Sequence, residues 1–470
     1  MKLLLAGREA GDGPSIRVTN PADGSLIDAV PEATPGEIAE ALDAAARGAR
    51  TMAATTRFER ARILERAASL LTERSEDFAR LLASEVGKTI REARLEVSRA
   101  ASTFALSADE ARRLAGEVVP FDAAPTGRDR IGFWVRVPVG VVAAITPFNF
   151  PLNLAAHKVA PAIAAGNAVV LKPASATPLT DLRLGSTLYE AGLPVDALSV
   201  LTGSGAAVGD ALVSHPLPRM VTFTGSAEVG KAIAARAGLK KLAMELGSNS
   251  AVIVTDRCDV DDAAARCVRG AYAVAGQVCI SVQRVLVHES VMDRFVDAAA
   301  AGAARLRVGD QMLEDTDVGP MIDEAQARRA EEWIAEAVRL GARLVCGGER
   351  SGSFVTPAVL TGVPDGARLW KDEAFAPVMA VRPYQALDEA IAAVNDSRCG
   401  LQAGVFTDDL SVVLRAAAEI ECGGVMINDV PSYRADLMPY GGVKESGLSR
   451  EGPRFAVEEM TEVRLVAFRR

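Results

Sequence analysis

The middle of the chain alternates short apolar runs with longer helical stretches, and this alternation restricts the possible folds more than any other feature. Residues 141–145, 168–171 and 220–223 are runs of apolar, largely β-branched residues typical of buried strands. The stretches 154–165 and 181–191 between them have helical composition. Strands that alternate with helices of this length predict a parallel sheet covered by helices. The expected fold class is therefore α/β.

A second series of the same kind follows, with a helix near 260–275 and strand runs at 251–254, 284–287, 343–346, 378–381 and 425–427. Because domains usually hold ~100–200 residues, a chain of 470 residues should form two or three of them. Thr34-Pro35-Gly36-Glu37 has the form of a capping box and predicts a helix start. A long helical region follows at 57–114, with a restart at 75–77.

Two further segments have the character of strands outside these series. Apolar and other residues alternate along 128–139, which is the period of a strand. The final run, 462–468, is also strand-like. We expect 128–139 to form a surface arm and the final run to pair with it.

Composition excludes several classes of function. The net charge of −9 argues against a nucleic-acid-binding face. No run of 18 apolar residues and no signal-peptide pattern occurs, so we expect a cytoplasmic protein without a membrane partner. The six cysteines lack C-x-x-C spacing, and only three histidines are present. We therefore expect reduced thiols, no metal site and no Ser-His-Asp triad.

Polar residues follow several of the predicted strands, where open parallel sheets bind ligands. Asn149 lies between Pro147 and Pro151, so its amide is held in a rigid corner and is suited to donating to an oxyanion, unless it only fixes the turn. Lys172 directly follows a strand and can reach a nucleotide, although a solvated loop lysine is the alternative. The glycine turn at 224–226 precedes a helix start that favours phosphate, but such a pattern alone is weak.

Two more residues carry possible chemistry. Glu245 follows an apolar strand, where burial would raise its pKa and favour a general base, while a structural ion pair is the plain alternative. Cys279 occupies a small-residue turn between a helix and a strand. Its thiol can act as a nucleophile if other groups converge on it, whereas the other five cysteines are expected to pack.

Seven segments, taken together in their order along the chain, indicate a protein family far more specifically than any one of them does. They are Thr146-Pro147-Phe148-Asn149, Lys172-Pro173-Ala174-Ser175, Phe223-Thr224-Gly225-Ser226, Glu245-Leu246-Gly247, Gly276-Gln277-Val278-Cys279, Glu373-Ala374-Phe375-Ala376-Pro377 and Pro439-Tyr440-Gly441-Gly442. This series resembles the NAD(P)-dependent aldehyde dehydrogenase superfamily over nearly the whole chain. The resemblance implies a Rossmann-type dinucleotide-binding domain (1–124 and 140–250), an α/β catalytic domain (251–430) and a small β oligomerisation arm (125–139 and 455–470).

The resemblance also implies roles for individual residues. Cys279 would be the nucleophile, Asn149 and the Cys279 backbone N–H the oxyanion hole, and Glu245 the base that activates water. The residues expected to bind the dinucleotide are Thr146, Pro147, Phe148, Lys172, Ser175, Gly209, Phe223, Gly225, Ser226, Leu246, Glu373 and Phe375.

The implied reaction is oxidation of an aldehyde to its carboxylic acid through a cysteine thiohemiacetal and thioester. Two alternatives are a coenzyme A-acylating relative, which typically lacks the glutamate found here at 245, and a catalytically silent structural or binding protein on the same fold. The intact Cys279, Glu245 and Asn149 argue against the silent protein.

Departures from the family pattern bear on the ligands. Ser175 stands where a glutamate that repels a 2′-phosphate is usual, so NADP is expected as the preferred cofactor, with NAD as the alternative. Arg99 and Arg434 are candidates for binding an anionic substrate group, and a salt bridge on the helix surface is the alternative for Arg99. Val278 occupies a position where relatives with doubly charged substrates often carry arginine. We therefore expect a small polar or singly anionic aldehyde, of semialdehyde or hydroxyaldehyde type, and a homodimer or homotetramer.

Overall fold

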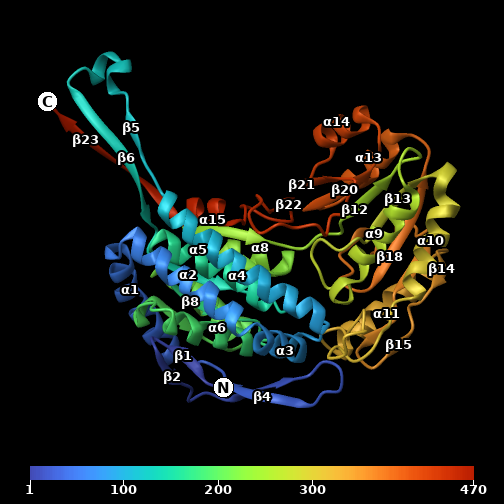
Figure 1. Cartoon of the computed structure of the whole chain (residues 1–470), viewed down its shortest axis with the longest axis horizontal. Helices are drawn as coiled ribbons and strands as arrows, with labels where there is room; N and C mark the ends of the chain where they lie inside the picture. The colour runs from blue at the N-terminus through green and yellow to red at the C-terminus, as the bar shows by residue number, and fades with distance from the viewer.

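The first of two large sheets has seven strands in the order β11-β10-β7-β8-β9-β1-β2 in this computed structural model, which describes residues 1–470 (Figure 1). The five parallel strands are β11 (Lys241–Glu245), β10 (Pro218–Thr224), β7 (Val141–Ile145), β8 (Ala168–Lys172) and β9 (Leu198–Val200). The predicted parallel sheet is confirmed for them. The N-terminal strands β1 (Leu3–Leu5) and β2 (Arg8–Ala10) add an antiparallel edge.

Helices pack on this sheet through apolar faces that their sequences specify. Thr34, Thr56 and Thr89 each form a capping box that fixes a helix start, as predicted for the first of them. The helices of this lobe are α1 (Pro35–Ala54), α2 (Arg57–Glu73), α3 (Ser75–Val86), α4 (Ile90–Arg113), α5 (Pro151–Ala165), α6 (Leu179–Glu190), α7 (Asp210–Ser214) and α8 (Ala227–Ala237), with short turns η3 (Val195–Ala197) and η4 (Gly205–Gly209). The predicted helix restart near Ser75 is confirmed.

The second sheet has the order β14-β17-β18-β13-β12-β20-β21 and forms the other lobe (Figure 1). Only β14 runs antiparallel to its neighbour. The strands are β12 (Ala251–Val254), β13 (Arg284–His288), β14 (Arg343–Cys346), β17 (Ala358–Thr361), β18 (Val378–Tyr384), β20 (Gln402–Phe406) and β21 (Gly424–Ile427). The covering helices are α9 (Val260–Tyr272), α10 (Met292–Ala304), α11 (Glu324–Arg339), α13 (Leu387–Asn395) and α14 (Leu410–Glu419).

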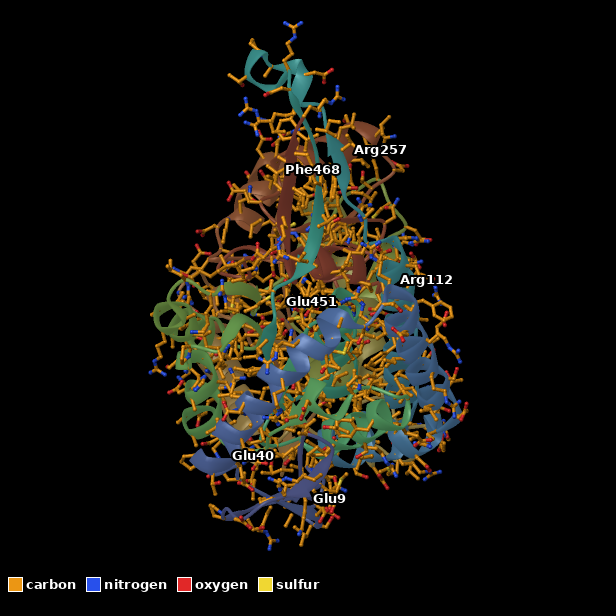
Figure 2. All side chains as sticks on the ribbon, turned by 90° about the vertical axis from the view of Figure 1, so that its left-hand side faces the viewer. Glu9, Glu40, Arg112, Arg257, Glu451 and Phe468 are labelled. Carbon is orange, nitrogen blue, oxygen red and sulfur yellow. The ribbon has the colours of Figure 1, made fainter.

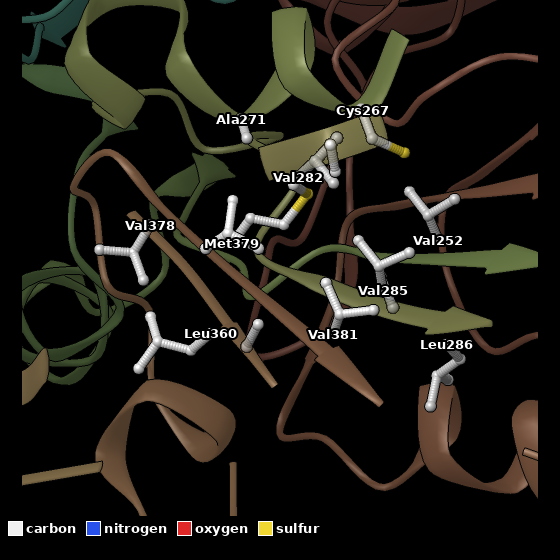
Figure 3. Close-up of a cluster of buried hydrophobic side chains, with 14 of the residues drawn as sticks. Val252, Cys267, Ala271, Val282, Val285, Leu286, Leu360, Val378, Met379 and Val381 are labelled. Atoms are coloured by element: carbon white, nitrogen blue, oxygen red, sulfur yellow. The ribbon is translucent and has the colours of Figure 1, made fainter. Parts of the chain in front are cut away.

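The core of the second lobe lies between its sheet and these helices (Figure 3). Val252 is paired with Val285, and Val285 with Val381, so the three side chains lie side by side on one face. Cys267 and Ala271 of α9 close the layer above them. Full burial of each such valine stabilises the fold by ~1.5–3 kcal/mol relative to exposure. All six cysteines are free thiols, as expected.

The helix predicted at 260–275 ends earlier than expected. Helix α9 stops at Tyr272, and Val274 and Ala275 adopt left-handed backbone with φ of 50° and 53°. The Val274 N–H donates instead to Glu92 Oε1 of the first lobe at 2.8 Å. A partner distant in sequence therefore overrides the local helical propensity.

An antiparallel arm projects from the first lobe and carries the C-terminus near its tip (Figure 1). Strand β23 (Thr461–Arg469) pairs with β6 (Arg130–Pro138) along its whole length, and β5 (Glu117–Val119) pairs on the other side of β6. The predicted pairing of these distant segments is confirmed. Phe468, labelled on the arm in Figure 2, is half exposed and lies 6.3 Å from Phe133, centroid to centroid.

The remaining elements are short connections. They are β3 (Ser15–Thr19), β4 (Leu26–Pro31), β15 (Arg350–Ser351), β16 (Phe354–Val355), β19 (Cys399–Gly400), β22 (Val443–Lys444), α12 (Arg368–Lys371), α15 (Pro453–Glu459), η1 (Phe121–Ala123), η2 (Pro125–Gly127), η5 (Ala273–Gly276) and η6 (Glu289–Val291). None of the helices has the length and apolar character that a membrane crossing requires.

Candidate active site

A cavity of about 1230 Å³ is lined by the strand ends of the first sheet, helix α4 and loops of the second lobe. This exceeds the ~300–1,000 Å³ of a pocket for one drug-sized ligand, so a dinucleotide and a small substrate can share it. Of the predicted site residues, only Glu245 and Ser175 lie outside its lining. Those in the lining are Arg99, Thr146, Pro147, Phe148, Asn149, Lys172, Gly209, Phe223, Gly225, Ser226, Leu246, Cys279, Glu373, Phe375 and Arg434.

The loop before Cys279 is held in an uncommon conformation. Besides the left-handed Val274 and Ala275, Gly276 has φ of +71°, and a Cβ there would lie 2.0 Å from the Ala376 carbonyl oxygen. Left-handed backbone at non-glycine residues is unfavourable and persists only where the surroundings impose it. The loop therefore sets the position of Cys279 rigidly.

Cys279 is half-buried, and its Sγ lies 2.9 Å from the hydroxyl oxygen of Tyr440. Burial raises the pKa of the Cys279 thiol to about 11, while the Tyr440 hydrogen bond and the Arg434 charge act in the opposite direction. A thiolate at this position therefore depends on nearby donors and cations for its stability.

Asn149 is placed beside the same loop. Its side chain is buried, and its Nδ2 donates to the Gln277 carbonyl oxygen at 2.8 Å. An amide nitrogen has two N–H groups, so one stays available to the cavity. The backbone N–H of Cys279 donates no hydrogen bond within the protein. The free N–H of Asn149 and the backbone N–H of Cys279 can therefore both donate to an atom bound beside the thiol.

Glu245 ends strand β11 and is buried, but it faces away from the large cavity. Its side chain lines a separate cavity of about 10 Å³ together with His157, Ser449 and Glu451. Neither carboxylate oxygen has a hydrogen-bond partner. Burial, with the nearby charge of Glu451, raises the pKa of Glu245 well above its ordinary value.

One end of the large cavity is suited to phosphate. Lys172 is 4% exposed, forms no ion pair, and donates only to the Pro173 carbonyl oxygen at 2.9 Å. Burial lowers its pKa to about 8. Ser226 caps helix α8, whose first residues line the cavity, so backbone N–H groups and the helix dipole favour an anion there. Gly225 is required because a Cβ would lie 2.4 Å from the Phe223 ring.

Glu373 and Phe375, two further residues predicted to bind the dinucleotide, also line the cavity. Glu373 accepts the Ser248 N–H at 2.9 Å, and a Cβ on Gly247 would lie 2.2 Å from its carboxylate. Burial raises the pKa of Glu373 to about 7. Phe375, with φ of 47°, packs edge-on against Phe148. Outside this lining, the Ser175 hydroxyl donates to the Gly203 carbonyl oxygen at 2.8 Å.

The other end of the cavity holds two arginines, each already paired with a carboxylate. Arg99 donates from Nε and Nη2 to Asp436 at 3.1 and 2.8 Å, and His157 also contacts Asp436 at 3.0 Å. The Arg434 side chain is 7% exposed and donates to Glu451 at 2.7 Å. Arg99 therefore forms a salt bridge, the alternative considered for it, but a largely buried one, and both arginines line the cavity.

Comparison with known proteins identifies the family. The family model described as "Aldehyde dehydrogenase family" matches residues 8–466. The chain belongs to the aldehyde dehydrogenase family. The predicted resemblance is thereby confirmed, and so is the α/β aldehyde dehydrogenase fold.

Relatives of this aldehyde dehydrogenase have been named for several small aldehydes. The 3-sulfolactaldehyde dehydrogenase of Priestia aryabhattai is 51% identical over 87% of this chain and 86% of its own. The NADP(+) succinate-semialdehyde dehydrogenase GabD of Escherichia coli is 39% identical over 97% and 95%. The crystal structure of aldehyde dehydrogenase 21 from Physcomitrella patens, in complex with the reaction product succinate, superposes with a TM-score of 0.97 at 41% identity and covers 100% of this chain and 98% of that one.

Sequence reasoning assigned no role to three buried residues of this aldehyde dehydrogenase. Tyr440 contacts Cys279, and Glu451 binds both Arg434 and Lys158. Burial raises the pKa of the Glu451 carboxyl, but the charges of Lys158 and Arg434 outweigh burial and hold this pKa well below its ordinary value. The available signal for Lys158 was a charged residue within the mostly apolar helix α5.

Proposed function

We propose that this aldehyde dehydrogenase oxidises a small polar or singly anionic aldehyde to its acid with NADP, using Cys279 as nucleophile. The observation that carries the proposal is that Cys279, Asn149 and the phosphate-binding end at Lys172 share one cavity. A thiol, an oxyanion donor and a nucleotide site are the three parts that cysteine-dependent aldehyde oxidation requires. The first sheet and its helices serve nucleotide binding in this proposal, and the second lobe carries the nucleophile.

The first step forms a bond between Cys279 Sγ and the aldehyde carbon, after the thiol has lost its proton. The carbonyl oxygen becomes an oxyanion, which accepts from the free Asn149 N–H and from the backbone N–H of Cys279. A bound nicotinamide nucleotide would accept the hydride that leaves this carbon as the oxyanion returns to a carbonyl. Cys279 is then left as a thioester.

Glu245 completes the reaction by taking a proton from the water that attacks the thioester, which releases the acid and restores the thiol. In the structure its carboxylate faces the small cavity, so the side chain must turn toward Cys279. Both of its oxygens lack partners, and turning therefore breaks no hydrogen bond.

The substrate class is supported by the charges at the far end of the cavity. Arg99 and Arg434 are each neutralised by one carboxylate, and Val278 adds no charge beside Cys279. Such a site can bind one anionic or polar group but offers little to a doubly charged one. The names of the relatives, among them sulfolactaldehyde and succinate-semialdehyde dehydrogenases, agree with this class.

A panel of aldehydes assayed with NADP and NAD tests the proposal. We expect succinate semialdehyde and lactaldehyde to be turned over better than butanal. In Arg434→Met, kcat/KM for the anionic aldehyde should fall about 10–100-fold, because a charge-assisted hydrogen bond contributes ~1.5–3 kcal/mol. Arg112→Met on the exposed side of α4 is the control. Best turnover of butanal, with Arg434→Met unaffected, would refute the substrate class.

The cofactor preference can be reversed at one position. NADP as cofactor is supported by the neutral Ser175, by Lys172 and by the NADP(+)-dependent relative. In Ser175→Glu, we expect kcat/KM with NADP to fall about 10–100-fold, through repulsion between the new carboxylate and the 2′-phosphate, and activity with NAD to persist. Ser69→Glu, on the exposed side of α2, should leave both unchanged.

KM for NADP, measured in the same assay, is expected to depend on the charge of Lys172 and therefore on pH. A lysine with a lowered pKa of about 8 is charged below that pH and neutral above it. KM for NADP should therefore rise as pH increases beyond about 8. An NADP affinity that is independent of pH between 7 and 10 would contradict a phosphate contact of Lys172.

The arm is proposed to join copies of the chain into a homodimer or homotetramer. It exposes a series of large apolar side chains at Ile131, Phe133, Val463, Leu465 and Phe468. Exposed apolar surface of this kind marks association sites. We expect Leu465→Asp to lower the mass measured by light scattering, whereas Leu239→Asp on the first lobe should not. A monomeric wild type would overturn this assignment.

A further inference from the structure

The hydroxyl of Tyr440 touches the sulfur that the proposed reaction uses. Its oxygen lies 2.9 Å from Cys279 Sγ, although the two residues are 161 positions apart. Tyr440 is 2% exposed, and this sulfur is the only hydrogen-bond partner of its hydroxyl. Leaving a buried hydroxyl without a hydrogen-bond partner costs free energy, so the hydrogen bond between Tyr440 and Cys279 is favoured.

The surroundings of Tyr440 make its hydroxyl the donor. The Arg434 guanidinium carbon stands 3.7 Å from the centre of the Tyr440 ring. A cation over the ring withdraws electron density, which strengthens the O–H as a donor and weakens the oxygen as an acceptor. Burial and the neighbouring Cys279 raise the pKa of Tyr440 well above its ordinary value, so the phenol keeps its proton.

The backbone holds this arrangement in place. The Tyr440 N–H donates to the Glu451 carbonyl oxygen at 3.1 Å, and the Glu451 N–H donates back at 2.6 Å. The Glu451 carboxylate in turn binds Arg434 at 2.7 Å and Lys158 at 3.0 Å. Ring, guanidinium and carboxylate are therefore fixed relative to one another, and the hydroxyl is aimed at Cys279.

We propose that Tyr440 is a further catalytic residue, whose hydroxyl donates a hydrogen bond to the Cys279 thiolate and stabilises the nucleophile before attack. The inference rests on the proposed role of Cys279. When the S–H bond breaks, its proton passes to water and the Tyr440 O–H bond stays intact. Once sulfur has bonded to the aldehyde carbon it carries no charge, and the hydrogen bond weakens. Tyr440 thus acts on the resting thiolate, whereas Asn149 acts on the oxyanion.

Loss of this hydrogen bond changes the alkylation rate of Cys279 in two opposing ways: it lowers the fraction of thiolate and raises the nucleophilicity of each thiolate. A hydrogen bond to a charged group is expected to lower the thiol pKa by about one. Removing it in Tyr440→Phe leaves about tenfold less thiolate at neutral pH. Each remaining thiolate is about threefold more nucleophilic, because reactivity rises with pKa with a Brønsted slope of ~0.4–0.5. The net expectation is alkylation about threefold slower at pH 7, with the whole rate–pH curve displaced to higher pH.

The direct test is iodoacetamide alkylation of Cys279 in the full-length protein, followed by mass spectrometry from pH 6 to 10.5. The other groups whose charges act on the thiol are Arg434, Glu373 and Glu245, and none is altered in Tyr440→Phe. Tyr384→Phe removes a buried hydroxyl that donates to a carbonyl in the second lobe, and it should leave the curve in place. A curve for Tyr440→Phe that superposes on wild type, or moves to lower pH, overturns the proposal.

A second variant guards against an indirect effect on folding. Incorporating 3-fluorotyrosine at position 440 keeps the ring and hydroxyl but makes the phenol a stronger donor. The alkylation curve should then move to lower pH, opposite to Tyr440→Phe. A displacement in the same direction as Tyr440→Phe would contradict a donor role. Because alkylation needs no aldehyde, these results stand apart from the proposed reaction, which the formation of NADPH measures separately.

Discussion

In Cys279→Ala, aldehyde-dependent formation of NADPH should fall by about 10⁴-fold or more. The nucleophile is the one group that forms a bond to the substrate carbon in the proposed reaction. The alanine removes only the thiol, so the loop held by Glu92 and Gly276 should keep its shape. The measurement is absorbance of NADPH at saturating aldehyde.

Two controls make the result specific. Cys258→Ala removes a half-buried thiol of the second lobe and should keep activity within about twofold. Binding of NADP to Cys279→Ala, followed by quenching of protein fluorescence, should match wild type. Retention of more than a tenth of the activity would exclude Cys279 as nucleophile and would favour a different group.

In Glu245→Gln, steady-state turnover should fall by about 10²–10⁴-fold, the usual contribution of a general base. The first turnover should survive, because attack by Cys279 and hydride transfer precede the step that needs the base. A rapid burst of NADPH equal to the number of sites should therefore precede a slow phase. Stopped-flow absorbance measures both phases, and loss of the burst would assign Glu245 to an earlier step.

The rate of the slow phase, which is thioester hydrolysis, is expected to depend on pH through Glu245. Burial raises the pKa of Glu245, so its basic form increases as pH rises, and wild-type thioester hydrolysis should accelerate toward alkaline pH. This rise should be absent in Glu245→Gln. Wild-type turnover that requires coenzyme A and yields an acyl-thioester product would instead support the acylating alternative.

Sequence patterns predicted the elements whose formation depends on neighbours in the chain. The apolar runs became β7, β8 and β10, and the Thr34–Glu37 capping box became the start of α1. Periodicity and caps act over a few residues, so they can be recognised without knowing the fold. The end of α9 was misplaced because Glu92, 182 residues earlier, draws the Val274 amide out of the helix.

The sequence by itself determined the family, through its series of motifs, and singled out Cys279, Asn149 and Lys172, which all line the cavity. Asn149 and Lys172 follow from residue types at the ends of parallel strands, which a parallel sheet brings to one edge. Only the tertiary structure decided that Tyr440 meets Cys279, that Arg434 covers the Tyr440 ring, and that Glu245 faces a separate cavity. Such contacts join segments far apart in the chain, and their geometry depends on how two lobes pack, which no local spacing encodes.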